Sequence, residues 1–407
     1  MHRSVSVSLV LLFALPALAQ AGPSAKEGPV PDTPTPNQLA AHELEDVKLR
    51  LDAIEAEQES PPDVLDAMKA ALGQTEVSGS IRAGYTANLV GPDAKRGANE
   101  LRLSDPDHNT FSLSYARLGV TRRVSRDRDF DVGFGVDVVA GRVVEEAFDD
   151  GLLQARGLGV GQAYAEVKTP VLGGLTVGAG KRYGWFGLES IDLSRNFHHS
   201  LSYAALSAPK TATGLSLELE LTEGLTYTQY LSNGWDEAID ANDAKSFGGQ
   251  LQLHSGRLTA ALNWIVDAER ADSEADLRWV LEATVRYGLG ESAELGFLAR
   301  YGEEEFDGRD ERFALFQAQV RREFFEGKLE AGVRVSFLRD EDGLITGRAQ
   351  SLVETTATLE FHPVSPVTIG LEYRHDESSK DGAFAGHRGQ ASRRGQDTLS
   401  VYFQLQF

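Results

Sequence analysis

Apolar and polar residues alternate with a period of two along most of this chain. In the last segment, 397–407, apolar and aromatic residues occupy every second position, and mostly serine and glutamine lie between them. Because successive side chains of a β-strand point to opposite sides, this pattern predicts a strand with one apolar and one polar face. The same alternation occurs in residues 77–85, 130–138, 215–222, 277–287, 293–301, 328–337 and 353–361. The pattern predicts an all-β structure.

The segments between the predicted strands fall into long and short connections that alternate along the chain. The long ones are near 91–109, 146–156, 186–209, 236–244, 268–275, 303–310, 340–350 and 377–395. The short ones are near 125–127, 170–173, 222–224, 255–256, 289–291, 325–326 and 363–365. This rhythm is typical of a transmembrane up-and-down antiparallel β-barrel, which has short periplasmic turns and longer outside loops. It predicts about 16 strands, within a range of about 14 to 18.

A closed barrel explains how such a sheet can meet lipid. In hydrocarbon an unpaired backbone N–H or C=O group costs several kcal/mol, so the sheet must close and leave no free edge. A barrel of about 16 strands is also wide enough for an aqueous lumen, which a barrel of about eight strands is not. The pattern therefore predicts a water-filled channel.

The N-terminal part of the chain has a different pattern. Residues 1–19 combine a basic start, an apolar stretch and a small-x-small end, which indicates a signal peptide. Residues 20–37 are rich in proline and small residues, so we expect a flexible linker. Residues 38–73 predict a periplasmic helical extension, because apolar residues recur there at spacings of three and four. That extension is either a short coiled coil joining protomers or one amphipathic helix packed on its own barrel. Residues 74–407 form the predicted outer-membrane barrel.

The composition argues against several other functions. The chain has no cysteine and a formal net charge of −21, so we expect no disulfide, no thiol chemistry and no nucleic-acid partner. Residues 178–184 imitate a nucleotide-binding loop, but they lie within a predicted strand and no helix follows. Zinc-protease, serine-hydrolase and dithiol motifs are absent from the sequence. We therefore expect no enzyme activity, no catalytic residue, no cofactor and no metal site.

Several short motifs in the second half of the chain resemble a known family. The most specific is Asn233, Gly234, Trp235 and Asp236, followed by Asp240 and Asn242. Weaker matches are Ser200-Leu201-Ser202-Tyr203, Pro209 with Thr213-Gly214, residues 371–376 and the terminal aromatic strand. Together they are similar to the OmpL-like β-barrel porin family (beta-barrel porin-2), and the likeness spans most of 174–407. The resemblance implies an outer-membrane porin and names no substrate.

Two positions depart from the pattern of that family. Leu201 stands where the family commonly has arginine, and Ala212 stands where it commonly has histidine. If those positions line the pore in the family, the charge and selectivity of the pore differ in this chain.

The long connection at 186–209 is the third outside loop by our count. In 16-strand porins this loop often folds inward and narrows the channel, which predicts a constriction where acids face bases. The candidate constriction residues are Glu189, Asp192, Arg195, His198, His199 and Lys210. The alternative is a loop that stays outside the barrel. A metal site at the two histidines is not expected, because nothing completes the coordination.

Charged residues on the polar rows of the strands are candidates for the pore lining. They are Arg82, Glu166, Arg182, Glu218, Arg278, Glu282, Arg286, Glu294, Arg300, Arg334, Glu354 and Glu372. Both signs are represented, so the set identifies no substrate and gives no basic ladder of the kind a phosphate-selective pore needs. Tyr183, Trp185, Trp264, Trp279 and Tyr301 suit the aromatic girdles at the membrane interfaces.

These observations favour an outer-membrane porin for passive diffusion of small hydrophilic solutes or ions. Its expected partners are membrane lipid, lipopolysaccharide and the solutes, and a homotrimer is one expected assembly. The alternative is a structural tether that binds periplasmic or cell-wall partners through its N-terminal helices. Deleting residues 20–72 separates the two hypotheses, because a porin would still conduct and a tether would fail.

Overall fold

The computed structural model describes the chain from residue 75 onward, with a few internal gaps. The described ranges are 75–148, 157–239, 243–268, 276–306, 308–386 and 391–407. The predicted signal peptide, linker and helical extension lie outside them. Among the described residues, no helix is long and apolar enough to cross a membrane.

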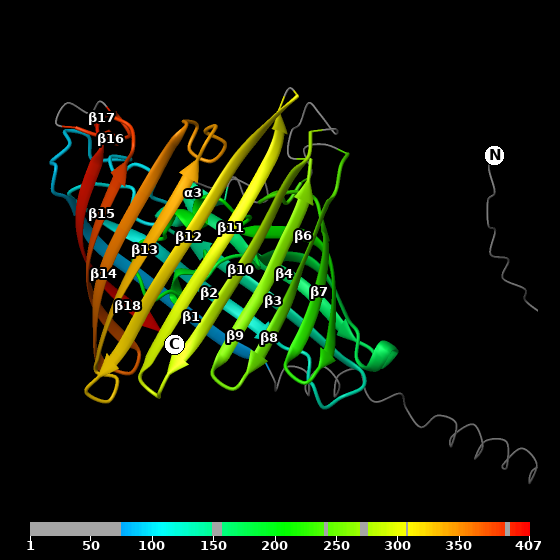
Figure 1. Cartoon of the computed structure of the whole chain (residues 1–407). Coiled ribbons are helices and arrows are strands. Elements are labelled where there is room, and N and C mark those ends of the chain that lie inside the picture. The colour runs from blue at the N-terminus through cyan, green and yellow to red at the C-terminus, as the bar shows by residue number, and fades with distance from the viewer. Residues whose placement is uncertain (1–74, 149–156, 240–242, 269–275, 307, 387–390) are drawn as a thin grey trace, which may run out of the picture. The chain divides into compact units, whose positions relative to one another are not determined.

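Sixteen antiparallel strands close into one barrel in the described part of the chain (Figure 1). In chain order they are β1 (Glu76–Asn88), β2 (Thr110–Arg122), β3 (Asp131–Ala140), β4 (Leu158–Lys168), β5 (Thr176–Tyr183), β6 (Thr211–Thr222), β7 (Leu225–Ser232), β8 (Ser246–Ser255), β9 (Leu258–Asp267), β10 (Arg278–Leu289), β11 (Ala293–Phe306), β12 (Arg309–Phe324), β13 (Leu329–Asp340), β14 (Gln350–Val364), β15 (Val367–Ser378) and β18 (Gly395–Gln406). Each pairs with its neighbours in sequence, and β1 closes the barrel against β18, where Tyr85 lies opposite Val401. The predicted strand number and up-and-down order are confirmed.

Short elements lie in the connections between these strands. β16 (Phe384–Ala385) and β17 (Ala391–Arg393) form a small hairpin between β15 and β18. The helical turns are α3 (Arg142–Ala147), η1 (Val171–Gly173), η2 (Leu193–Arg195) and η3 (Tyr203–Leu206). We call the end of the barrel with the tight turns, such as the one joining β6 to β7, the short-turn end. The opposite end is the long-loop end.

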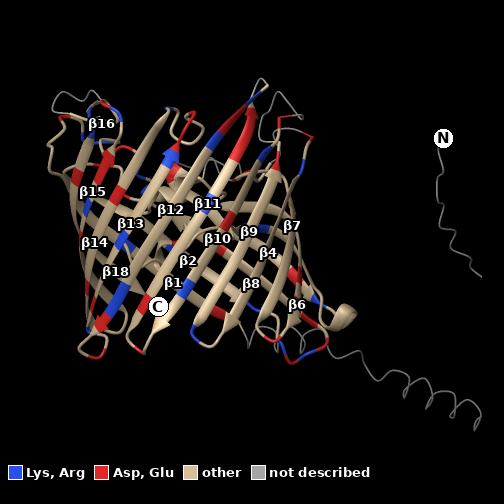
Figure 2. Cartoon of the chain, viewed as in Figure 1, with Lys and Arg blue, Asp and Glu red and all other residues tan. Residues whose placement is uncertain are grey.

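The outer surface of the barrel is apolar. On β6, Leu215 and Leu217 are 52% and 44% exposed, whereas Ser216 between them is 9% exposed. On β18, Val401 is 50% exposed and Tyr402 is 1% exposed. Such a surface suits lipid and not water. Figure 2 shows charged residues of both signs along the strands, and those on the polar rows point into the barrel.

The predicted long connection at 303–310 is wrong. β11 and β12 stay paired as far as Phe306 and Arg309, so most of this segment is a strand hairpin. Its charged residues hide the alternation, because an acid on one strand binds a base on the other. Glu303, for example, makes an ion pair with Arg312 at 2.9 Å.

Candidate functional site

The connection between β5 and β6, residues 184–210, folds into the barrel; we call it the inner loop. Two 3₁₀ turns shape it. Asp192 begins η2 by accepting a hydrogen bond from the Ser194 amide at 3.1 Å, and Ser202 begins η3 by accepting one from the Ala204 amide at 3.2 Å. The sequence left open whether this connection folds into the barrel or stays outside it, and in the structure it folds inward.

Four buried arginines on the strands hold the backbone of the inner loop, one each from β1, β11, β13 and β15, and the partly exposed Arg286 of β10 donates to the Leu188 carbonyl oxygen. Arg82 donates to the carbonyl oxygens of Asn196 (2.9 Å) and His198 (3.0 Å), Arg300 to Ala204 (2.6 Å), Arg334 to Ser200 (2.8 Å) and Arg374 to Leu201 (2.6 Å). Each of these arginine side chains is at most 2% exposed. Buried carbonyl groups must find donors, and the guanidinium offers several in one plane. The strands therefore fix the path of the loop.

Carboxylates on the strands complete this attachment. Glu372 accepts hydrogen bonds from the amides of His199 at 2.7 Å and Ser200 at 2.9 Å. Glu354 makes an ion pair with Arg334 at 2.6 Å, and Arg334 also binds Glu189 of the inner loop. A buried charge is tolerated only when it is paired and hydrogen-bonded, so the network depends on all of its members.

Apolar side chains of the inner loop pack against the same side of the lumen. Phe186, Leu188 and Tyr203 form a buried cluster with residues on the inner faces of the strands. These inward apolar residues are Ile265, Val280, Leu298, Phe313, Leu315, Leu338 and Leu352. The polar row of β10 is interrupted at Val280 because the loop, and not water, contacts it there. We call the loop-covered inner face of β10–β15, β18 and β1 the sealed wall.

A cavity of about 660 Å³ remains on the other side of the inner loop. Its lining comes from loop residues 184–190, 192 and 194–196 and from inward residues of β2, β4, β5, β7 and β8, which we call the open wall. Glu76 and Ser78 of β1, Arg286 of β10 and Gln406 of β18 also line it, so it extends to the short-turn end and borders strands of the sealed wall as well. A second cavity of about 30 Å³ shares Phe186 and Glu189 with the first, and has room for about one or two waters. All residues that line the small cavity, except Arg300, belong to the inner loop, so this cavity lies within the folded loop.

The connection between β3 and β4 also turns inward. Its helix α3 buries Val143, which packs with Tyr115 of β2 and with Leu193 and Leu201 of the inner loop. Leu201 is one of the two departures from the family pattern, and it lies in this apolar cluster at 3% exposure. An arginine at this position would have to bury its charge in apolar surroundings.

Three of the six predicted constriction residues lie at the edge of the large cavity. Glu189, Asp192 and Arg195 all line it. The Arg195 side chain is 58% exposed and lies 3.3 Å from Asp192, which is also 3.7 Å from Arg117 on β2. An acid on the loop therefore lies opposite a base on the wall, and of the six candidate residues these three border the large cavity.

His198 and His199 lie against the sealed wall and not in the cavity. The Nδ1 atom of His198 is 2.7 Å from the Thr358 hydroxyl, and the His199 ring stacks on Tyr402 with 4.5 Å between centroids. Burial, followed by the charge of Arg334, lowers the pKa of His198 from 6.5 to about 3, and burial also lowers the pKa of His199. Both rings are neutral at pH 7 and have packing partners in place of a metal.

The twelve predicted pore-lining charges face the interior but fall into two groups. The first group is at most 2% exposed and belongs to the sealed wall: Arg82, Glu282, Arg300, Arg334, Glu354 and Glu372. The second group keeps more contact with solvent: Glu166, Arg182, Glu218, Arg278, Arg286 and Glu294. Within it, Arg182 binds Glu166 at 2.6 Å on the open wall. The sequence predicts only that these charged side chains face inward, and this does not distinguish the buried group from the more exposed one.

Lys210, the sixth predicted constriction residue, is bound by the Asn-Gly-Trp-Asp motif. Asp236 accepts hydrogen bonds from the Lys210 amide at 2.6 Å and the Thr211 amide at 2.8 Å, and its other oxygen is 2.7 Å from Lys210 Nζ. Trp235 lies under the guanidinium of Arg278, 4.9 Å away. The motif therefore fixes the start of β6, while Asp240 and Asn242 lie outside the described residues.

Sequence reasoning missed several members of the network. Arg374 and Asp376 form a buried ion pair at 2.7 Å, and Arg102 of the first long connection reaches Asp376 at 3.1 Å. Both β15 residues share the inward face with Glu372, so the alternation could have revealed them. Arg102 lies in a connection, where no period marks the inward side.

Two of the predicted girdle aromatics face inward. Trp185 donates from Nε1 to the Gly249 carbonyl at 3.1 Å and stacks on Tyr230 with 4.0 Å between centroids. Tyr183 packs in the buried cluster around α3. Both lie beside the start of the inner loop, which turns them away from lipid. Trp279 and Tyr301 pack together on the outward row, 5.4 Å between centroids.

The family profile described as "Putative beta-barrel porin-2, OmpL-like" matches residues 74–407. The chain belongs to this porin family. The match covers every strand of the barrel and begins after the predicted helical extension. Membership makes the chain a porin-type barrel of the outer membrane, as the sequence motifs implied. Comparison with curated protein sequences gives no match.

Solved structures of other porins share the fold. An anion-selective porin from Comamonas acidovorans aligns with a TM-score of 0.56 and 14% identity over 82% of this chain and 99% of its own. OmpT of Vibrio cholerae, in its trimer form, aligns with a TM-score of 0.55 and 11% identity over 82% of this chain and 99% of its own. The outer membrane channel DcaP of Acinetobacter baumannii aligns with a TM-score of 0.56 and 13% identity over 82% of this chain and 97% of its own. At these identities the likeness concerns the fold.

Proposed function

We propose that this porin lets small hydrophilic solutes or ions diffuse passively, and that their route follows the open wall past the edge of the inner loop. One observation carries the proposal: the inner loop is fastened to one side of the lumen and leaves a charged cavity of about 660 Å³ on the other. Two proteins of similar fold, an anion-selective porin and an outer membrane channel, support transport as the function.

The charges around this cavity suit polar solutes. Arg195 of the loop and Arg182 of the wall are partly exposed to it, whereas the loop acids Asp192 and Glu189 are nearly buried beside their ion partners. Exposed charges beside a narrow aqueous space create a field, which orients dipolar solutes and lowers the cost of removing their water. The field does not require movement or turnover, which fits passive diffusion.

A matched pair of tryptophan substitutions tests the route. Thr121 of β2 lines the cavity, whereas its neighbour Val120 lies on the outward row. In planar bilayers we expect discrete conductance steps for the wild type, smaller steps for Thr121→Trp and unchanged steps for Val120→Trp. Absence of steps at any voltage from a folded barrel would contradict the porin. Equal steps in both variants would place the route elsewhere.

We further propose that residues 1–19 are removed as a signal peptide, that 20–37 form a flexible linker ahead of a periplasmic extension at 38–73, and that the barrel assembles as a homotrimer in lipid and lipopolysaccharide. The apolar outer surface supports the lipid contact, and OmpT is described in a trimer form. Cross-linking of the native membrane protein tests the assembly. Trimers that persist after deletion of residues 20–72 would show that the barrel alone makes the interface.

The tether hypothesis has no comparable support. It depends on residues 38–73, and the family match does not include them. Passive diffusion through the barrel remains the proposed role, without enzymatic chemistry.

A further inference from the structure

Three acidic residues lie side by side on the inner face of the barrel at the short-turn end. Glu323 of β12 pairs in register with Glu330 of β13, and Glu330 pairs with Glu360 of β14. Like charges directly opposite one another on neighbouring strands destabilise a sheet. The Glu330 and Glu360 side chains are only 12% and 8% exposed, so water screens them poorly. This row favours a cation between its members.

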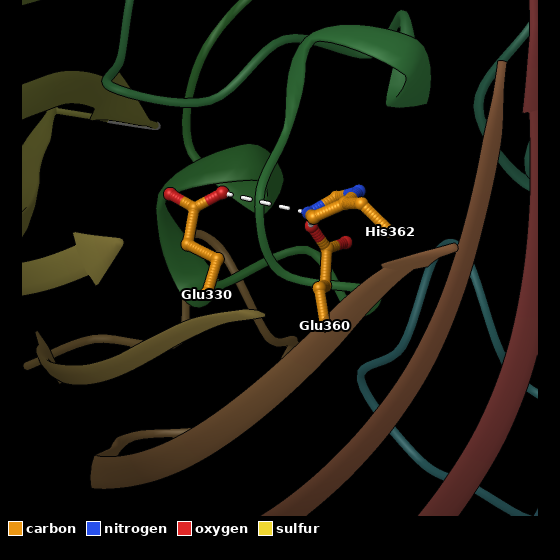
Figure 3. A group of neighbouring side chains, drawn as sticks. All are labelled: Glu330, Glu360 and His362. Carbon is orange, nitrogen blue, oxygen red and sulfur yellow. Dashed lines mark ion pairs between the residues drawn. The ribbon is translucent and has the colours of Figure 1, made fainter. Parts of the chain in front are cut away.

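His362 completes a compact group with two of these acids (Figure 3). Its Nε2 atom is 3.6 Å from Oε2 of Glu360 and 3.9 Å from Oε2 of Glu330. One ligand atom from each of the three residues lies within 4.8 Å of the other two. The His362 side chain is 29% exposed, so an ion in the lumen could reach the group.

Each of the three residues has a second polar atom that faces away from the other two, and a further residue contacts that atom. Tyr402 donates its hydroxyl to Oε1 of Glu360 at 2.6 Å, and the Thr368 hydroxyl is 3.1 Å from Nδ1 of His362. Arg321 lies 3.5 Å from Oε1 of Glu330. Outer partners of this kind orient metal ligands, and the contact at Nδ1 leaves the other ring nitrogen for the ion.

We propose that Glu330, Glu360 and His362 bind a divalent transition metal, with Zn²⁺ as the best match. Zinc binds histidine nitrogen and carboxylate oxygen at about 2.0–2.2 Å, so ligands of a tetrahedral ion lie about 3.3–3.6 Å apart. The two separations measured from His362, 3.6 and 3.9 Å, need to shrink by at most a few tenths of an ångström, and the two carboxylate ligand atoms lie within 4.8 Å of each other. Three protein ligands leave one position for water. A histidine ligand distinguishes zinc from magnesium and calcium, which prefer oxygen alone. The bound ion would join β13 to β14 at the mouth of the barrel.

Zinc titration of the metal-stripped full-length mature protein in detergent tests the site. By calorimetry we expect one tight zinc site in the wild type and at least 10-fold weaker binding in His362→Gln and Glu360→Gln. Thr368→Val should weaken binding about 10-fold through loss of ligand orientation. His254→Gln is the matched control, because its Nδ1 atom contacts the Thr259 hydroxyl at 3.0 Å and it makes no ion pair among the described residues. This control should bind zinc like the wild type.

Cobalt gives a second readout that does not depend on conductance. Co²⁺ in a site with nitrogen and oxygen ligands should show visible d–d absorption that zinc displaces and that His362→Gln lacks. Thermal unfolding of each variant checks that the barrel is intact. Two results would overturn the proposal: no zinc binding by the folded wild type, or equal binding by wild type and His362→Gln, which would place the ion elsewhere. Either outcome leaves the porin function unaffected.

Discussion

Arginines on the two sides of the lumen have different partners and different exposure. Arg334 on the sealed wall is completely buried and binds two carboxylates and a loop carbonyl. On the open wall, the Arg182 side chain is 24% exposed, binds Glu166 and lies 3.6 Å from the Tyr164 ring centre. Both are inward arginines on strands of one barrel. The difference arises from what faces each of them, the inner loop or the cavity.

This difference separates structural charges from charges that act on solutes. A fully buried and paired guanidinium projects little field into water, because its counter-charges lie within hydrogen-bonding distance. A partly exposed guanidinium at the cavity keeps some of its field in the solvent. We therefore expect substitutions on the sealed wall to change stability and loop position, and substitutions at the cavity to change selectivity.

The largest effect is expected from Arg334→Met. The variant removes the nearest cation from the buried Glu354 and Glu189, which keep Arg374 at 3.5 Å and the Ser202 donors, and breaking a buried ion pair from one side costs about 3–5 kcal/mol. Thermal or urea unfolding in detergent should show this loss, and larger or noisier conductance steps should accompany release of the loop. Arg339→Met on the same strand is the control, because Arg339 is 60% exposed and binds only Glu341 at 2.9 Å; it should cost less than about 1 kcal/mol. Similar losses in both variants would contradict the division into two walls.

A pH effect on the inner loop comes next in size. His198 is neutral in the folded protein down to about pH 3, whereas an unfolded histidine gains a proton near 6.5. The released loop therefore binds more protons than the packed loop between these values, so loop stability falls as the pH is lowered through this window. Hydrogen-exchange protection factors of residues 196–206, which are corrected for the pH dependence of the intrinsic exchange rate, should fall below about pH 6. In His198→Gln this fall should be weaker, since the acidic groups remain in both proteins and only the histidine is lost. The same pH profile in both would assign the effect to the carboxylates.

The wall of the barrel could be predicted from the sequence, whereas the division of its lumen could not. Alternation gives the inward side of each strand, since one residue in two must meet lipid. It does not show whether Arg300 or Arg182 meets water, because a buried pair and a solvated charge both occupy polar positions. The available signal was the interruption of the polar row at Val280, where an apolar residue faces inward. Such interruptions mark contact with a loop. Ile265 and Leu298 also face inward, in the same buried cluster as Val280 and the apolar residues of the inner loop.

Connections were the other limit of sequence reasoning. Residues 186–209 were correctly identified as the long third connection, but a loop has no period that would show which side chains face the cavity. Arg195 and His198 are three residues apart, yet one is exposed and the other is buried. The turn at η2 and the donors from four strands decide this difference, and neither is visible in the local sequence.

A smaller effect, confined to selectivity, is expected from Arg195→Glu. Arg195 reaches the cavity, so reversing its charge should raise the ratio of cation to anion permeability. A change of about 0.5–1 kcal/mol in the energy of a cation relative to an anion in the cavity corresponds to a change of about 2–5-fold in this permeability ratio. Reversal potentials in a salt gradient measure this ratio, and the unfolding midpoint should stay nearly constant. Arg339→Glu, on the outward row at the long-loop end, should leave the ratio unchanged. An equal shift in both variants would mean that charge anywhere on the barrel controls selectivity.

An effect on stability alone, with no change in selectivity, is expected from Asp236→Asn in the family motif. Asparagine keeps an oxygen for the Lys210 and Thr211 amides but loses the charge that binds Lys210 Nζ. The cost should be about 1 kcal/mol in unfolding free energy, and Asp236→Ala should cost more, because two amides then lose their acceptor. Neither substitution should move the reversal potential, since the motif fixes the start of β6 outside the large cavity. If Asp236→Asn changed selectivity as strongly as Arg195→Glu, the motif would belong to the conducting route, and its resemblance to other porins would then reflect the pore and not the framework around it.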